Sequence, residues 1–202
     1  MKPNKRLVTR MGLFRLAVVV FVAGLAACDG KPSGEADESA GIPPERMADA
    51  LFAVMVADRT VYSNEVVYRL QDVEEVVKAS EHWDSQKALP LPAQMFRMGA
   101  GLVAKQTDAF SYALLSKWPL NKESGPKTEV EVAGLDSVAE NPSKPFYGRE
   151  KVGDVEYFTA VYADVAVSPS CVTCHNAHED SPRNDFKQGD VMGGIVIRIP
   201  LH

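Results

Sequence analysis

Apolar residues recur at three- and four-residue steps through residues 44–77, which is the period of an amphipathic helix. The stripe contains Met47, Leu51, Val54, Met55, Val61, Val66, Leu70, Val73 and Val77. Pro44 suits the first position of a helix, and Ser63-Asn64 either caps a second segment or merely interrupts one long helix. The stripe has two uses open to it: packing inside the domain, or a seam between two copies of the chain in a homodimer.

The middle of the chain predicts a helix, a strand and a further short helix. Leu89-Pro90-Leu91-Pro92 interrupts the chain, and a new helix is expected to begin at Pro92. Residues 110–118 alternate enough for a strand, with Phe110, Tyr112 and Leu114 on one side. Residues 128–140 predict the short helix. Its buried side is expected to carry Val132, Leu135 and Val138.

The C-terminal third is rich in β-branched and aromatic residues, which predicts strands. We expect strands over residues 145–151, 155–165 and 191–201, with Gly153-Asp154 as a hairpin turn between the first two. Gly193-Gly194 in the last strand indicates a bulge or a close backbone approach to a bound group.

The N-terminus has the organisation of a bacterial export signal. Five basic residues and no acidic one precede an apolar run of twelve residues, 16–27. This run is too short to span a membrane, which takes about 20 residues. Leu25-Ala26-Ala27-Cys28 resembles a lipobox, so residues 1–27 are predicted to be a lipoprotein signal peptide and Cys28 to carry the lipid. The alternative is an ordinary cleavage site with a bystander cysteine. Residues 28–43 would be a flexible tether, and residues 44–202 the folded domain.

Export changes both the charge and the expected location. Loss of the five basic residues of the leader would change the formal net charge of −5 to −10. A surface this acidic argues against nucleic acid and anionic lipid as partners, and it would suit a basic redox partner. The predicted location is the periplasmic side of a bacterial membrane, with the domain held by its lipid anchor.

The candidate chemistry lies in Cys171-Val172-Thr173-Cys174-His175. This C-x-x-C-H run is the mark of covalent c-type haem attachment. Two thiols three positions apart lie on one side of a helical turn and can add to the two vinyl groups of one haem, while His175 supplies the proximal imidazole. The sequence has three cysteines. With Cys28 lipidated, none is left for a disulfide.

The same residues have three alternative interpretations. A thioredoxin-type redox pair would need a βαβ context, and none is evident. A zinc site of Cys171, Cys174, His175 and His178 is too cramped, because His175 is covalently adjacent to Cys174. Chance occurrence is the remaining alternative. The motif therefore predicts one covalently attached haem c.

Several further stretches resemble a known family. They are Pro92-Ala93-Gln94 at a helix start, residues 112–118 before an Asn/Pro turn, Glu129 with Leu135, residues 171–178, Ser181-Pro182, residues 185–194 and Ile199-Pro200. Together they resemble the single-haem c-type family with a PAS-like haem-sensor domain, over roughly residues 45–201. That family includes stand-alone cytochromes and the extracytoplasmic sensors of bacterial receptors, kinases and cyclases.

The resemblance implies an α+β fold: a PAS-like central antiparallel sheet flanked by helices, here with a long N-terminal helical region. It also implies one haem held against the sheet and a role in redox chemistry or haem-based sensing. Cys171, Cys174 and His175 carry over directly. Some relatives place a cysteine near the start of the helix predicted at Pro92, where this chain has none.

The sixth iron ligand is therefore open. Met95 is the first candidate, because it lies on the predicted ligand helix, and Met98, His82 and an open five-coordinate iron are alternatives. His178 is expected to hydrogen-bond a haem propionate rather than bind iron, and Met192 is expected to fill strand core.

Two functions follow from these expectations. The first is a membrane-anchored monohaem cytochrome that transfers electrons. The second is a haem-based redox or gas sensor that acts through a separate protein partner. No general acid/base constellation lies near the motif, so the chain is not expected to be an enzyme.

Overall fold

The computed structural model describes residues 41–201. The predicted signal peptide, the lipidation of Cys28 and most of the tether lie outside these residues. Within 41–201, no helix is both long and apolar enough to span a bilayer.

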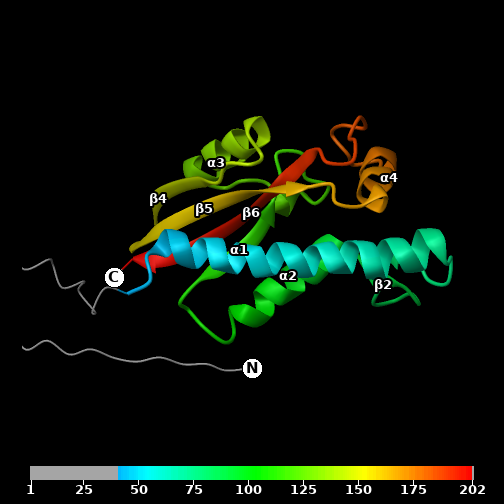
Figure 1. Cartoon of the computed structure of the whole chain (residues 1–202), viewed down its shortest axis with the longest axis horizontal. Helices are drawn as coiled ribbons and strands as arrows, with labels where there is room; N and C mark the ends of the chain where they lie inside the picture. The colour runs from blue at the N-terminus through cyan, green and yellow to red at the C-terminus, as the bar shows by residue number, and fades with distance from the viewer. Residues whose placement is uncertain (1–40, 202) are drawn as a thin grey trace, which may run out of the picture. The chain divides into compact units, whose positions relative to one another are not determined.

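A long N-terminal helical region crosses one face of the sheet (Figure 1). It consists of α1 (Pro44–Val61) and, continuing without a break, the π-helical segment η1 (Tyr62–Val73). Ser63 does not cap a new helix. Its hydroxyl instead donates back to the carbonyl oxygen of Arg59, one turn earlier in the same helical region, at 2.8 Å. The predicted choice at Ser63-Asn64 is thus resolved as one long helical region.

Short elements connect this region to the sheet. Strands β1 (Ala79–Ser80) and β2 (Leu89–Pro90) pair in parallel, and α2 (Pro92–Val103) begins at the predicted proline. The 3-10 turn η2 (Lys122–Ser124) follows β3 (Ser111–Leu115) and precedes α3 (Glu129–Glu140). Helix α3 begins with a capping box, in which Thr128 Oγ1 accepts from the Glu131 N–H at 3.1 Å.

The sheet has four antiparallel strands in the order β3-β6-β5-β4. Strands β4 (Phe146–Val152) and β5 (Val155–Val165) form the predicted hairpin, and Gly153 takes a positive φ of 62° in its turn. Strand β6 (Val191–Leu201) pairs with β3 and β5. Helix α4 (Pro169–Ala177) follows β5 and lies beyond the end of the sheet (Figure 1).

Two apolar layers sandwich the sheet and confirm the predicted α+β class. One face packs against α1 and α2 through Ala48, Phe96, Phe158, Ala160, Tyr162, Ile195, Ile197 and Ile199. The other packs against α3 through Leu115, Leu135, Val138, Val161 and Val196. The period-2 alternation along β5 and β6 assigns each side chain to its layer.

The helix predictions were right in position, but the long helical region ends at Val73 and not at residue 77. They were partly wrong in facing. Val54, Val61 and Val73 of the predicted stripe are 62%, 57% and 60% exposed, and Val132 of α3 is also exposed. Met47, Leu51 and Met55 pack inward as expected. The inward face of the long helical region continues instead through Arg59, Ser63 and Val67, all buried, because it follows four-residue steps regardless of side-chain polarity.

Gly193 and Gly194 permit close packing within the protein. A Cβ at Gly193 would clash with the Leu115 carbonyl oxygen, and one at Gly194 would lie 2.7 Å from the Leu135 side chain. A register shift at Asp164/Val165 lies opposite these residues. The predicted close approach is therefore to strand β3 and helix α3.

A buried polar network fixes α3 to the sheet. Arg198 on β6 donates to Glu131 at 2.6 Å and to Glu150 at 2.7 Å, and Thr159 also donates to Glu150 at 2.7 Å. Burial alone would raise the pKa of Glu150, but hydrogen bonds from Thr128, Thr159 and Arg198 outweigh burial and hold that pKa below its usual value.

Glu150→Gln should lower stability at neutral pH and reduce the further loss on acidification. A carboxylate whose folded pKa is depressed stabilises the fold above its unfolded pKa of about 4.3, and this contribution disappears as pH falls through the folded pKa. Urea midpoints at pH 7 and at about pH 3.5 measure the effect. Glu156→Gln, at an exposed pair with Arg149, is the matched control; equal acid sensitivity in wild type and Glu150→Gln would contradict the prediction.

Candidate functional site

Helix α4 presents the motif to a cavity. Ser168 caps the helix by accepting from the Ser170 N–H, and Pro169 occupies its first turn. Cys171, Cys174 and His175 then fall at i, i+3 and i+4, so they share one face of the helix. All three line the same cavity of about 490 Å³.

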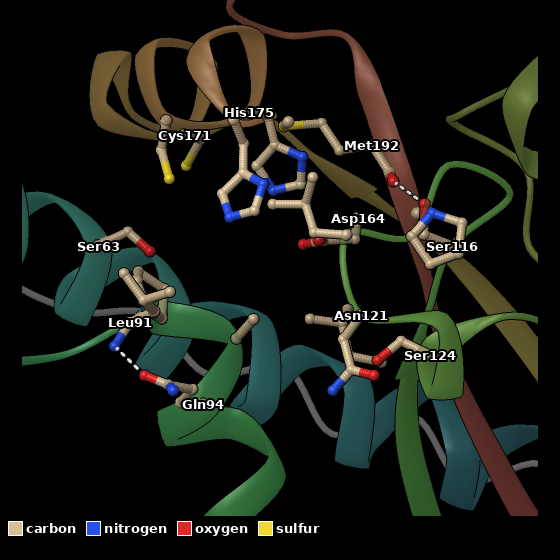
Figure 2. Close-up of a pocket in the computed structure, with 18 of the residues that line it drawn as sticks. Ser63, Leu91, Gln94, Ser116, Asn121, Ser124, Asp164, Cys171, His175 and Met192 are labelled. Carbon is tan, nitrogen blue, oxygen red and sulfur yellow. Dashed lines mark hydrogen bonds between the residues drawn. The ribbon is translucent and has the colours of Figure 1, made fainter. Parts of the chain in front are cut away.

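The cavity lies between α4 and several distant segments (Figure 2). Cys171 and His175 enter from the α4 side, and Leu91 and Gln94 from the start of α2 lie opposite them. Ser116, Asn121 and Ser124 close a further side. Gln94 is held in place, because its Oε1 accepts from the Leu91 N–H at 2.9 Å and its Nε2 donates to the Glu81 carbonyl oxygen at 2.8 Å.

Burial favours the neutral forms of all three motif side chains by raising the pKa of both thiols and lowering that of the imidazole. Burial lowers the pKa of His175, so its imidazole is held neutral, and its buried Nδ1 has no hydrogen-bond partner in the described chain. Burial raises the pKa of the Cys171 thiol, although the nearby Arg59 opposes this. Both cysteines are free thiols. A reactive redox pair would need a lowered thiol pKa, so this environment does not favour that alternative.

The aromatic ring of Phe186 packs against the His175 ring. The His175 ring meets Phe186 edge-to-face with centroids 5.9 Å apart. Asn176 fixes the Phe186 backbone in two directions, accepting from its N–H at 3.0 Å and donating to its carbonyl oxygen at 2.9 Å. Phe186, Met192 and Ala166 form a small buried cluster with Trp118. Met192 is 7% exposed within it, in the core role predicted for it.

A buried ion pair forms part of the cavity wall. Arg59 donates from Nε and Nη2 to the two carboxylate oxygens of Asp164, each at 2.8 Å. Both residues are 8% exposed and both line the cavity. Burial opposes the Arg59 charge, but Asp164 holds the Arg59 pKa above its usual value. Sequence reasoning missed this pair; the available signal was that Arg59 and Ser63 continue the four-residue steps from Met55.

Two polar contacts tie α4 to the segments that follow α1. Ser170 Oγ donates to Asp72 of η1. His178 Nε2 lies 3.2 Å from Glu81 Oε1, and His178 Nδ1 accepts from the Asp180 N–H at 3.1 Å. His178 does line the cavity, but both ring nitrogens are already engaged by the protein. This arrangement does not favour the propionate contact predicted for His178.

Three of the predicted sixth-ligand candidates, Met95, Met98 and His82, lie outside the cavity. Met95 is half-buried in α2 and Met98 is 41% exposed, and neither lines the cavity; the same helix contributes Pro92, Ala93, Gln94 and Arg97 instead. His82 lies exposed in a turn outside the lining. The structure thus brings together Cys171, Cys174, His175, His178 and also Met192 at one cavity, and leaves Met95 apart from them.

The residues present fit a haem better than a zinc ion. In the part of the chain that the structure describes, no group of three or more His, Cys, Asp or Glu side chains converges as a metal site. By contrast, two free thiols and a neutral imidazole share one helix face, and the adjoining volume is of the size typical of cofactor sites. Cys171 and Cys174 would hold the group, and His175 would bind its iron.

Comparison with known proteins places this chain in a family. No curated protein matches the chain. Among solved structures, the crystal structure of the cyanobacterial heme-protein Tll0287 matches over 80% of this chain and 98% of that chain, with 16% identity and a TM-score of 0.47. The model of the Tll0287-like family matches residues 39–200, which covers the described domain except for the last residue of β6. The chain therefore belongs to the Tll0287-like family.

Proposed function

We propose that this protein is a monohaem c-type cytochrome that transfers electrons on the periplasmic side of a bacterial membrane, to which its lipid anchor holds it. The observation that carries the proposal is the convergence of Cys171, Cys174 and His175 on one cavity. The haem-protein named among the structural matches agrees with it. The iron would supply one-electron oxidation and reduction, Cys171 and Cys174 would anchor the haem, and His175 would bind its iron.

A signalling role has one specific observation in its favour. Helix α4 is tied to the C-terminal end of the long helical region by the Ser170–Asp72 hydrogen bond and to the next segment by the His178–Glu81 contact. A change at His175 that moves α4 would therefore act directly on the long helical region. In this second candidate function, the iron's redox state or a bound gas shifts that region, and a separate protein reads the change.

Optical spectra and potentiometry of the purified mature protein, with and without CO or NO, separate the two functions. A low-spin spectrum that gas does not change supports electron transfer. Saturable gas binding to the ferrous protein supports sensing. A pyridine haemochrome with no thioether-linked iron porphyrin would exclude both functions as proposed.

Met95→Ala should leave the Soret band and the reduction potential close to those of the wild type. The reason is that Met95 does not line the cavity, so its removal leaves the surroundings of the haem unchanged. Spectra of both oxidation states, with Met98→Ala as a matched variant on the same helix, measure this. A shifted Soret band in Met95→Ala alone would restore Met95 as the sixth ligand.

Membrane attachment through Cys28 is part of the proposal and rests on the lipobox-like sequence. Cys28→Ser should shift the protein from the membrane fraction to the soluble periplasmic fraction, because one diacylated residue would be its anchor. Fractionation and mass spectrometry of the N-terminal peptide measure this. A wild-type N-terminal peptide that carries no acyl mass at Cys28 would contradict the lipid anchor while leaving the haem site in place.

A further inference from the structure

Arg59 carries a guanidinium nitrogen that the described chain leaves unsatisfied. Its Nε and Nη2 are occupied by Asp164, whereas Nη1 is buried and has no hydrogen-bond partner. The residue is 8% exposed, so solvent does not readily compensate Nη1. An unpaired donor on a buried charged group is costly, which suggests that its acceptor comes from a group outside the polypeptide.

The position of Arg59 identifies where that acceptor would lie. Arg59 and Asp164 both line the cavity that also receives Cys171 and His175, and Figure 2 shows Asp164 beneath His175. Asp164 fixes the guanidinium through two parallel hydrogen bonds, so Nη1 is held in one direction. The pair is formally neutral, and Nη1 keeps the polarised N–H groups that favour an anionic oxygen.

We propose that Arg59 is a haem-binding residue whose Nη1 donates to one propionate carboxylate. This inference rests on the proposed function. The propionates are the anionic oxygens that a haem brings into the cavity, and a carboxylate matches guanidinium geometry. His178 is less suited, because Glu81 and the Asp180 N–H already engage its ring. Arg97 also lines the cavity but is exposed, so water satisfies it without a ligand.

Resonance Raman spectroscopy of the haem-loaded protein tests the assignment through the propionate bending bands. Arg59→Gln should shift one propionate band relative to wild type, and Arg59→Lys should restore part of the shift. The midpoint potential of Arg59→Gln should fall, because the unpaired Asp164 charge favours ferric iron. Arg69→Gln, at an exposed arginine in the same long helical region, is the matched control. If Arg59→Gln does not fold, the propionate bands are measured in the double variant Arg59→Met/Asp164→Leu instead.

Pyridine haemochrome analysis of every variant keeps the inference separate from the proposed function. Haem attached in all variants with unchanged propionate bands in Arg59→Gln and the double variant would overturn the role of Arg59. A band shift in Arg97→Gln alone would assign the propionate to Arg97. A changed CO stretching frequency with unchanged propionate bands would place Nη1 against an iron-bound ligand, which also overturns the proposal. Absence of haem from wild type would instead contradict the proposed function.

Discussion

Replacing Cys171 and Cys174 together by alanine should abolish covalent haem in the purified protein. Each thioether needs one thiol added across one vinyl group, so removal of both thiols removes both covalent links. Both residues are free thiols at the cavity wall and have no disulfide partner in the described chain. Denaturing mass spectrometry should show loss of the haem mass, and the pyridine haemochrome of acid-acetone-extracted protein should be absent.

The single cysteine variants sharpen this expectation. Cys171→Ala and Cys174→Ala should each retain at most one thioether, which gives a pyridine haemochrome α-band between those of haem c and haem b. Thr173→Ala, on an exposed position of the same helix, is the control and should retain the full haem mass. Haem mass remaining on the double variant would show that attachment uses other residues.

The strands of the four-stranded sheet were predictable because their signals are local, although β3 is shorter than the expected 110–118 and the β1–β2 pair was not expected. β-branched and aromatic residues are concentrated in β5 and β6, and Gly153-Asp154 supplies the turn between β4 and β5, so these bounds agree with the sequence-based expectation. The C-x-x-C-H motif was predictable for the same reason, since its spacing alone places three side chains on one helical turn. Features encoded within a few residues needed no knowledge of tertiary structure.

The rest of the cavity was not predictable in this way. Arg59 and Asp164 are separated by 105 positions, and only the packing of the long helical region across β5 brings them together. Reading apolar periodicity also selected exposed Val54 and Val61 over buried Arg59 and Ser63, because hydrophobicity says nothing about a buried polar group with a partner. Met95 lay on the right helix, but which face of that helix meets the cavity depends on how β3 and the helix dock.

Breaking the Arg59–Asp164 pair from one side should cost about 3–5 kcal/mol of unfolding free energy, because it leaves one buried charge uncompensated. Both side chains are about nine-tenths buried, so solvent cannot replace the missing partner. Arg59→Met and Asp164→Leu should each show this loss, whereas the double variant should recover most of it, since two apolar side chains leave no buried charge. Urea unfolding of the haem-loaded proteins measures the three changes.

The exposed Lys117–Asp136 pair is the internal comparison, with side chains 39% and 47% exposed. Asp136→Asn should cost about 0–1 kcal/mol, because solvent screens an exposed pair. If the double variant loses as much as the sum of its single variants, the two residues do not act as a pair. The double variant should also be less stable than wild type in unfolding free energy. If haem binding satisfies Nη1, this difference should be larger between the haem-loaded proteins than between the haem-free proteins. Recovery that is equal in both forms would mean that the pair serves only the fold.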